Sequence, residues 1–156
     1  MAESVKALGG LDGLIVVADA TLPDPGFACT PAAWDDVMAA NTRSVWLVIK
    51  AAYPYLKQSK GAVAVVVPTA ALVPDGNDLA KGASLASTVL LARVFAQELA
   101  RDGVRVNIVA AGAEGAKGAA DAALFLLGAG AGYISGQTLA VDDGILDRSA
   151  GAALGS

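Results

Sequence analysis

The hydrophobic positions of this chain form four short unbroken runs, separated by longer stretches in which apolar residues recur at helical spacing. An unbroken apolar run bounded by turn residues is typical of a strand that is buried on both of its faces. Such strands occur in parallel sheets whose faces are covered by helices. The runs predict strands at Leu14–Ala18, Gly61–Val67, Val104–Ala110 and Gln137–Val141.

The stretch between the second and third runs, Asp78–Gly103, predicts one long helix with two apolar stripes. A surface helix needs only one such stripe, so two stripes indicate burial against the sheet and against a second partner. Arg101 in the last turn and Gly103 just beyond it mark the end of this helix. The first stripe consists of Leu85, Val89, Ala92, Ala96 and Leu99, and the second of Thr88, Leu91 and Phe95.

A second helix is predicted over residues 31–57, between the first two strands. Thr30 is a typical N-cap residue, and Pro31 after it suits the first helical position. Trp46 and Tyr55 lie outside the inner apolar stripe of this helix, so it too has a second apolar face. Both long helices are therefore expected to contact something besides their own sheet.

The order of elements predicts an α/β fold. A short helix at Ala2–Leu8 comes first, then strands alternate with helices, the last helix covering about Ala119–Leu127. Alternation of this kind predicts about four parallel strands in the spatial order 1-2-3-4, flanked by helices. Without an internal repeat or linker, residues 1–148 are expected to form one domain, followed by a tail of small residues at 149–156.

Composition narrows the functional classes. The chain has 156 residues, 55% of them hydrophobic, a net charge of −4 and no basic cluster, so we expect no nucleic-acid partner. No uninterrupted apolar run reaches the length of about 18 residues that a membrane span needs, and the N-terminus lacks the apolar core of a signal peptide. We therefore expect a soluble, cytoplasmic protein without a membrane partner.

Metal and nucleophile chemistry have few candidate residues. The absence of histidine excludes Ser-His-Asp catalysis and most zinc sites, and a single cysteine, Cys29, excludes an internal disulfide and a thiolate cage. Cys29 has no histidine base to activate it. Asp142-Asp143-Gly144 is explained by a turn, so no metal site is expected there. Asn107, in the middle of a predicted strand, is expected to link that strand to a loop.

Five segments fall in one order and at one spacing that resembles the short-chain dehydrogenase/reductase family, in particular its ketoacyl-carrier-protein-reductase-like members. The resemblance covers Ala2 to about Leu146 and corresponds to the later part of the family fold. It implies a reduced Rossmann-like, three-layer domain whose last helix covers the opposite face from the other two, whereas the usual handedness of crossovers would place it on the same face. The segments are Leu11–Leu14, Trp34-Asp35 with Asn41, Gln97–Ala100, Val104–Asn107, and Tyr133–Gln137 with Val141–Gly144.

The same resemblance implies a chemistry that this chain matches only in part. The family's Gly-rich turn, which seats the pyrophosphate of NAD(P) on a helix N-terminus, has no counterpart here. Asp19 stands where the family has a glycine beside the cofactor. Of the family's four catalytic positions, the serine falls on Pro68, the tyrosine on Lys81 and the lysine on Leu85, and only the asparagine is matched, by Asn41.

Three residues remain candidates for chemistry in this cleft: Asn41, Thr69 and Lys81. Asn41 is also explained as a structural amide that bonds to helix backbone and buried water, and Lys81 as a residue that caps or solvates a helix start. Thr69 could replace the lost serine hydroxyl, although strand alternation from Pro68 points it the other way. Since Leu85 cannot supply the charge that lowers the pKa of a proton donor, we assign no catalytic residue. Since the Gly-rich turn is missing, we predict no cofactor.

These departures leave three hypotheses open. The preferred one is a catalytically inert family member that acts as a structural or oligomerisation partner, bound to itself or to an intact family enzyme through the helices at 31–57 and 78–102. The second is an NAD(P)-dependent oxidoreductase completed by a partner chain, or an enzyme with new chemistry in the old cleft. The third is a fragment, which predicts an open edge at the strand Leu14–Ala18.

Overall fold

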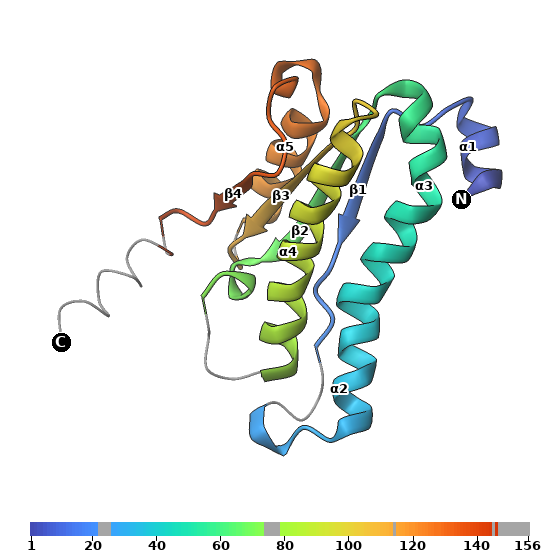
Figure 1. Cartoon of the computed structure of the whole chain (residues 1–156). Coiled ribbons are helices and arrows are strands. Elements are labelled where there is room, and N and C mark those ends of the chain that lie inside the picture. The colour runs from blue at the N-terminus through green and yellow to red at the C-terminus, as the bar shows by residue number, and fades with distance from the viewer. Residues whose placement is uncertain (22–25, 74–78, 114, 145, 147–156) are drawn as a thin grey trace.

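The structure is a computed structural model, drawn in Figure 1, that describes residues 1–21, 26–73, 79–113, 115–144 and 146. Its centre is one parallel sheet with the strand order β1-β2-β3-β4. This confirms the predicted α/β fold, the four parallel strands and their spatial order. The predicted tail at 149–156 lies outside the described residues. The strands are β1 (Gly13–Val17), β2 (Ala62–Pro68), β3 (Arg105–Ala111) and β4 (Thr138–Val141).

Neighbouring strands pair over unequal lengths. All seven residues of β2 pair with β3, from Ala62 opposite Arg105 to Pro68 opposite Ala111. β1 pairs with the first five residues of β2, and β4 pairs only with the second half of β3, from Ile108 onward. The two central strands are therefore the best supported part of the sheet, and the shorter strands form its two edges.

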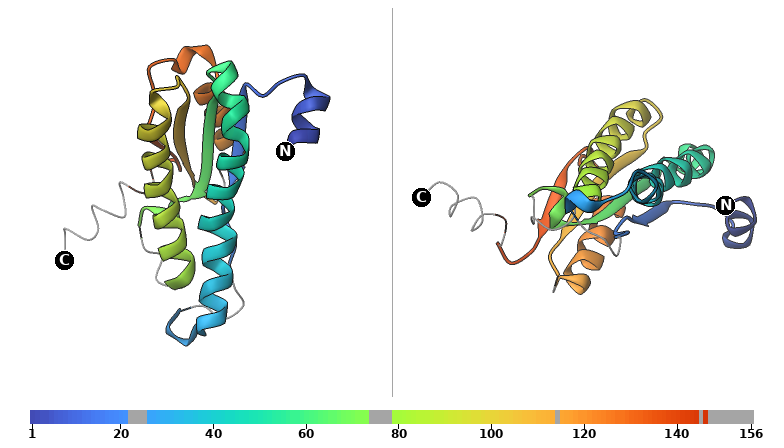
Figure 2. Two further views of the ribbon diagram at one scale, coloured as in Figure 1. Left: turned by 45° about the vertical axis from the view of Figure 1, so that its right-hand side comes forward. Right: turned by 90° about the horizontal axis from the view of Figure 1, so that it is seen from below.

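One face of the sheet is covered by two long helical segments that lie side by side in Figures 1 and 2. The predicted helix at 31–57 is here two α-helices joined by one π-helical turn, which the sequence pattern did not predict. The wider turn holds Asn41, whose buried side chain bonds to the loop after β1, and π turns of this kind often occur at functional sites. The segments are α2 (Pro31–Met38), the π turn η2 (Ala39–Arg43), α3 (Ser44–Ser59) and α4 (Leu79–Ala100).

α4 confirms the inner stripe that the sequence predicted. All five residues from Leu85 to Leu99 in that stripe are buried, and so is Thr88, while Leu91 and Phe95 are half-buried. By length and composition alone α4 could cross a membrane, the one such helix among the described residues. Here it packs against β2 and β3 as the central helix of the fold, and central helices of water-soluble domains share that composition.

Among the described helices, α5 (Ala116–Leu127) covers the opposite face, and Figure 2 shows it across the sheet from α3 and α4. The connection from β3 through α5 to β4 therefore runs against the usual handedness of parallel crossovers, as the family resemblance implied. α5 packs on β2 and β3 through a smaller cluster with many alanines. That cluster comprises Ala64, Val109, Ala119, Ala123, Leu126 and Ala131.

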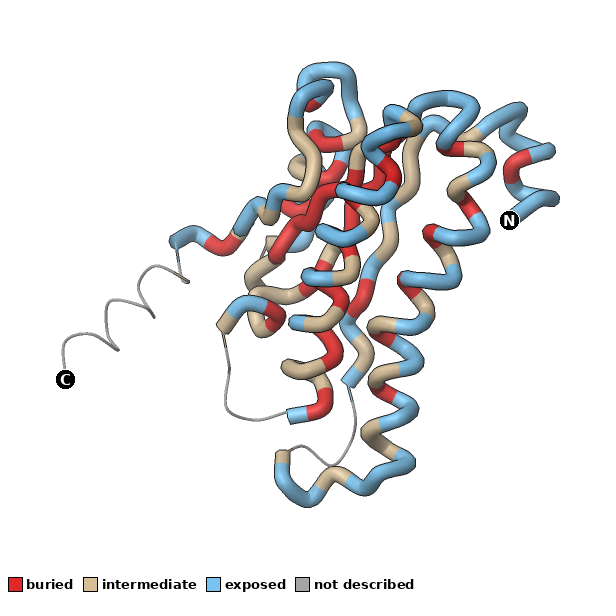
Figure 3. The backbone as a smooth tube through the Cα atoms, viewed as in Figure 1, coloured by how far each residue is buried: buried red, intermediate tan, exposed pale blue. Residues whose placement is uncertain are grey.

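The remaining described segments are short. α1 (Ala2–Leu8) stands off the sheet beyond the amino end of β1 and ends at Gly9, whose φ of 77° is the left-handed conformation. Figure 3 shows the buried residues gathered in the sheet and on the inner sides of the helices, so the core lies between these layers. Three 3₁₀ turns complete the chain: η1 (Gly26–Ala28), η3 (Thr69–Ala71) and η4 (Ala129–Ala131).

Candidate functional site

A cleft of about 990 Å³ lies at the carboxyl ends of β1, β2 and β3, where ligands bind in open α/β sheets. It forms because the chain turns away from the sheet at Ala18, Pro68 and Ala111, while α5 closes one side. Most of its wall is apolar, from β1, β2 and the alanine face of α5. The side chains at its polar end belong to Asp19, Thr69 and Lys81.

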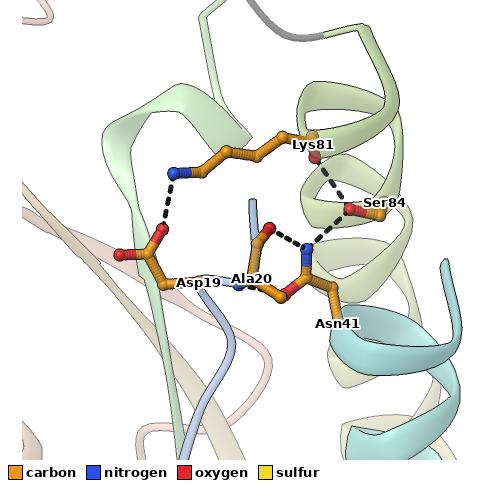
Figure 4. Close-up of polar contacts among 5 residues, drawn as sticks. All are labelled: Asp19, Ala20, Asn41, Lys81 and Ser84. Atoms are coloured by element: carbon orange, nitrogen blue, oxygen red, sulfur yellow. Dashed lines mark hydrogen bonds and ion pairs between the residues drawn. The ribbon is translucent and has the colours of Figure 1, made fainter. Parts of the chain in front are cut away.

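Lys81 crosses the mouth of this cleft from the first turns of α4 to the loop after β1 (Figure 4). Its Nζ lies 2.7 Å from Oδ1 of Asp19, and only 20% of the lysine side chain is exposed. The sequence predicted that Lys81 caps or solvates the start of the helix. The ion pair corrects this prediction. The lysine instead ties α4 to the end of β1 with a carboxylate that stands where the family has glycine.

Asn41 lies behind the cleft wall and is fully buried. Its Oδ1 accepts a hydrogen bond from the Ala20 amide at 2.7 Å, and its Nδ2 donates to the Ala20 carbonyl and to Ser84 Oγ, both at 2.9 Å (Figure 4). Ser84 Oγ in turn donates to the carbonyl of Lys81 at 2.9 Å. The side chain has structural partners, but these are the backbone of Ala20 in the loop after β1 and the hydroxyl of Ser84 on α4, and not the helix backbone that was expected.

The other positions implied by the resemblance do not form a proton-transfer group. Pro68 and Thr69 both line the cleft, because the chain leaves the strand at Pro68 and enters a 3₁₀ turn, where strand alternation no longer applies. Leu85 is fully buried in the core between α4 and the sheet. The structure thus brings Thr69 and Lys81 to one cleft and leaves Asn41 outside it.

The Gly-rich connector between β3 and α5 faces the same cleft, and its glycines are packed closely. A Cβ atom added to Gly115 would lie 2.8 Å from the Val141 carbonyl oxygen, and one added to Gly118 would lie 2.9 Å from Val141 Cγ1. These glycines permit close packing against β4, so the space beside them is filled by protein. The described part of this connector therefore packs against β4 at Gly115 and Gly118.

The remaining candidates have structural partners. Asp142 accepts hydrogen bonds from the amides of Gly144 and Leu146 at 3.0 and 2.8 Å, so it shapes the predicted turn. Asn107 donates to the Ile134 carbonyl and accepts from the Gln137 amide, and so links β3 to a loop, the one before β4, as predicted. Within the described ranges, no group of three acidic, cysteine or histidine residues could hold a metal ion.

Two polar clusters that the sequence did not reveal hold the elements together. Arg105 donates to the carbonyls of Leu126 at 2.7 Å and of Leu127 and Gly128 at 3.2 Å, which caps α5, and burial lowers the pKa of its guanidinium. Asp102, after α4, accepts from Lys57 Nζ at 2.8 Å and from the Tyr53 hydroxyl. No local sequence signal pairs these residues, because they are far apart along the chain.

Comparison with known proteins agrees with this architecture. The family model described as enoyl-(acyl carrier protein) reductase matches residues 1–119. The chain belongs to the short-chain dehydrogenase/reductase family. It is 30% identical to glucose 1-dehydrogenase of Gluconobacter oxydans over 93% of this chain and 66% of that enzyme, and 36% identical to cis-2,3-dihydrobiphenyl-2,3-diol dehydrogenase of a Pseudomonas strain over 70% and 41%.

Solved structures of the short-chain dehydrogenase/reductase family share the fold closely. An oxidoreductase of this family from Burkholderia thailandensis superposes with a TM-score of 0.80 at 27% identity, over 94% of this chain and 69% of that one. The chain spans two thirds or less of the length of the curated relatives named above. Activities and substrates of those whole proteins are therefore not transferred with the fold.

Proposed function

We propose that this short-chain dehydrogenase/reductase chain is a non-catalytic family member that acts as an assembly subunit. The observation that carries the proposal is the polar end of the cleft. Where the resemblance places a tyrosine and a lysine, Lys81 is ion-paired with Asp19 and Leu85 is buried in the core. A proton donor that serves hydride transfer needs a neighbouring cation that lowers its pKa, and Leu85, at the position of the family's lysine, supplies no charge.

The proposed function includes no NAD(P) cofactor, for a related reason. A dinucleotide brings two phosphates, and binding sites for them use a Gly-rich turn, a helix N-terminus or unpaired cations. The glycines beside α5 are packed against β4, and the cation at the mouth of the cleft, Lys81, is ion-paired with Asp19. We therefore expect no NAD(P) binding in the range in which reductases work.

Assembly through the outer surface of α3 and α4 is supported by apolar side chains that are exposed or half-buried there. Leu90 is 62% exposed, and a groove of about 390 Å³ runs between the two helical segments. The groove is lined in part by Trp46 and Leu91, two residues that the sequence singled out for this contact. We name this surface the helix face: Trp46, Leu47, Leu90, Leu91 and Val94.

Two measurements test this function. Calorimetric titration with NADH and with NADPH should show no binding tighter than about 100 μM, on the usual scale for such cofactors. Light scattering at micromolar concentration should show an oligomer, and Leu90→Lys should lower its mass while the far-ultraviolet circular dichroism stays unchanged. Cofactor binding below that limit, or a monodisperse monomer, would refute the proposal. A location in the cytoplasm stays a prediction.

The second candidate is an oxidoreductase that a partner chain completes. One observation favours it, since the cleft at the strand ends is open instead of filled by apolar side chains, and Thr69 and Lys81 reach it. The same titration separates the two candidates when it is repeated on Asp19→Gly, the residue that the family resemblance places there. Cofactor binding by the wild-type chain would favour the enzyme, whereas binding only by the variant would support an inert cleft.

A further inference from the structure

The segment formed by α2, η2 and α3 has a buried stripe whose spacing does not fit an unbroken α-helix. Val37 and Val45 are both buried. An α-helix turns by about 100° per residue, so the eight steps from residue 37 to residue 45 would place Val37 about 80° away from Val45. The π turn absorbs one step, because the Ser44 amide bonds to the Ala39 carbonyl, five residues back. Seven steps leave the two valines within about 20° of each other, so the π turn puts Val37 on the buried side.

The same segment offers a second arrangement, in which the turn is α-helical. Met38 lies seven steps before Val45 and Trp34 lies eleven, so an unbroken α-helix would bring both within about 20° of the Val45 side. In the structure both are half-buried, and Val37 is 2% exposed. Either arrangement buries apolar side chains of α2. We call them the valine register, which the structure shows, and the methionine register.

α2 is the part of this segment that can turn. In α2, whose residues are all described, Val37 is the buried position. α3 is fixed to the sheet, because four of its side chains are fully enclosed in the main core. These are Val45, Ile49, Ala52 and Leu56. A change of register would therefore rotate α2 by about 80° and leave α3 in place.

Side-chain bonds to neighbouring segments select the valine register. The buried amide of Asn41, in the π turn, accepts from the Ala20 amide and donates to the Ala20 carbonyl and to Ser84 Oγ. Thr42 Oγ1 donates to the Ser84 carbonyl at 2.9 Å. Thr88 Oγ1, also on α4, donates to the Asn41 carbonyl at 3.2 Å. An α-helical turn would rotate Asn41 and Thr42 relative to α4 and weaken these bonds, so they hold the π turn in place.

We propose that α2 switches between the two registers, and that the contact of Asn41 with the loop after β1 selects the valine register, in which the groove of the helix face is formed. Asp35 and Met38 line that groove from the α2 side. In the methionine register Met38 turns inward, so the groove loses this wall. The loop after β1 also carries Asp19, which pairs with Lys81 at the mouth of the cleft. A molecule that displaces this loop from the cleft would therefore weaken the contact through the helix face.

The first test uses Trp34 as a reporter of the register. The chain has two tryptophans, so Trp46→Phe leaves Trp34 alone. In this background, Asn41→Leu should lower the quenching of Trp34 fluorescence by iodide by about half, because the indole turns from a half-buried position toward the core side. Leucine has nearly the shape of asparagine but cannot bond to Ala20, so the substitution removes the contact that selects the register.

The matched control is Asn107→Leu. Asn107 is also fully buried and bonds to a loop, but it lies on β3, so its substitution should leave Trp34 quenching unchanged. Thr42→Val, which loses a hydroxyl bond from the π turn, should lower the quenching less than Asn41→Leu, and it decides the proposal if Asn41→Leu does not fold. Unchanged quenching in the folded variant, checked by circular dichroism, would overturn the proposal.

The second test removes the residue that makes the π turn necessary. Ala40 is exposed, and without it Val37 lies seven steps before Val45, so an unbroken α-helix places it about on the buried side. Deleting Ala40 from the Asn41→Leu variant should therefore return Trp34 quenching to the value of the parent chain. A general loss of stability would not be corrected by a deletion. If the deletion leaves the quenching low, the two-register account is wrong.

The last test connects the registers to assembly and rests on the proposed function. By light scattering and native mass spectrometry over a concentration series, Asn41→Leu should raise the dissociation constant of the helix-face contact about tenfold, and deletion of Ala40 should restore it. If Asn41→Leu turns Trp34 but leaves this constant unchanged, the link between loop and groove is wrong. A monomeric wild-type chain would refute the assembly and its control by the groove, while the Trp34 measurement would still decide the registers.

Discussion

Helices cover the two faces of the sheet to different extents. On one face, α3 and α4 cover the strands with a continuous core that includes fully buried Ile49, Leu56 and Leu85. On the other face, α5 covers β2 and β3 through mostly alanine side chains and leaves Ile15 and Val17 of β1 exposed. The same strands therefore have one face that is fully covered by helices and one face that is covered only in part.

The two faces also differ in how polar groups hold their helices. On the α3/α4 face, the buried side chains of Asn41, Ser84 and Thr88 bond to each other or to neighbouring backbone, which ties the π turn to α4 and to the loop after β1. On the other face, α5 depends on Arg105 at its C-terminal end. The α3/α4 face is therefore held by a buried polar network as well as by packing, and the α5 face by one arginine at the end of its helix.

The largest expected effect comes from matched core truncations on the two faces. Leu85→Ala should lower the free energy of unfolding by about 4 kcal/mol, and Leu126→Ala by about 2 kcal/mol, within the usual range for buried leucines. The difference follows because Leu85 is enclosed on all sides, whereas neighbours of Leu126 border an open cleft and can relax. Urea unfolding followed by circular dichroism measures both, and equal losses would show that the two faces are equally well packed.

An intermediate effect is expected at the cap of α5. Arg105→Met retains the apolar stem but removes the hydrogen bonds to the carbonyls that end α5, which should destabilise the fold by about 1.5–3 kcal/mol. Amide exchange should then accelerate in α5 and not in α4. The control is Arg93→Met, whose exposed guanidinium donates only to Thr138 in the described contacts, and it should stay within about 0.5 kcal/mol of the wild type.

The smallest effect is a pH dependence at the end of α4, on the covered face. The hydrogen bond from Lys57, followed by that from Tyr53, lowers the pKa of the Asp102 carboxyl below its usual range. A lowered folded-state pKa stabilises the fold above the usual carboxyl value of about 4, and this contribution is lost as the pH falls through the folded value. Asp102→Asn should therefore lower the thermal midpoint at pH 7.

The pair of Lys57 and Asp102 also predicts how stability changes at alkaline pH. The hydrogen bond that Lys57 donates to Asp102 raises the pKa of Lys57, so its contribution is present at neutral pH and disappears as the pH rises above about 10.4. The midpoints of wild type and Asp102→Asn should converge at both ends of the pH range. A difference that persists at pH 2 would show that the substitution acts through packing instead of charge. Asp121→Asn, at an exposed pair with Lys117, is the control for surface charge.

Much of the fold could be predicted because its signals are local. Unbroken apolar runs identified the four strands, and the stripe from Leu85 to Leu99 identified the buried side of α4. The N-cap at Thr30 was also predicted, and its Oγ1 accepts from the Ala33 amide at 3.2 Å. Each of these features depends on residues within a few turns of one another, so spacing along the chain is sufficient.

The candidate site was only partly predictable. The chain's own residues revealed which polar types were missing, and the family resemblance located Asn41, Lys81 and Leu85. It did not reveal that Lys81 pairs with Asp19, or that Asn41 bonds to Ala20 outside the cleft. The π turn that positions Asn41 has no periodic signal of its own, since its flanking helices share one apolar stripe.

The sequence by itself determined the strands, the order of elements and the chemistry that the chain lacks, because buried runs, caps and missing residue types are properties of the linear chain. Only the tertiary structure decided which face α5 covers, that the cleft stays open, and that a π turn joins α2 to α3. Those outcomes depend on contacts between residues far apart along the chain. Their free energies are set by three-dimensional packing, which hydrophobic periodicity does not encode.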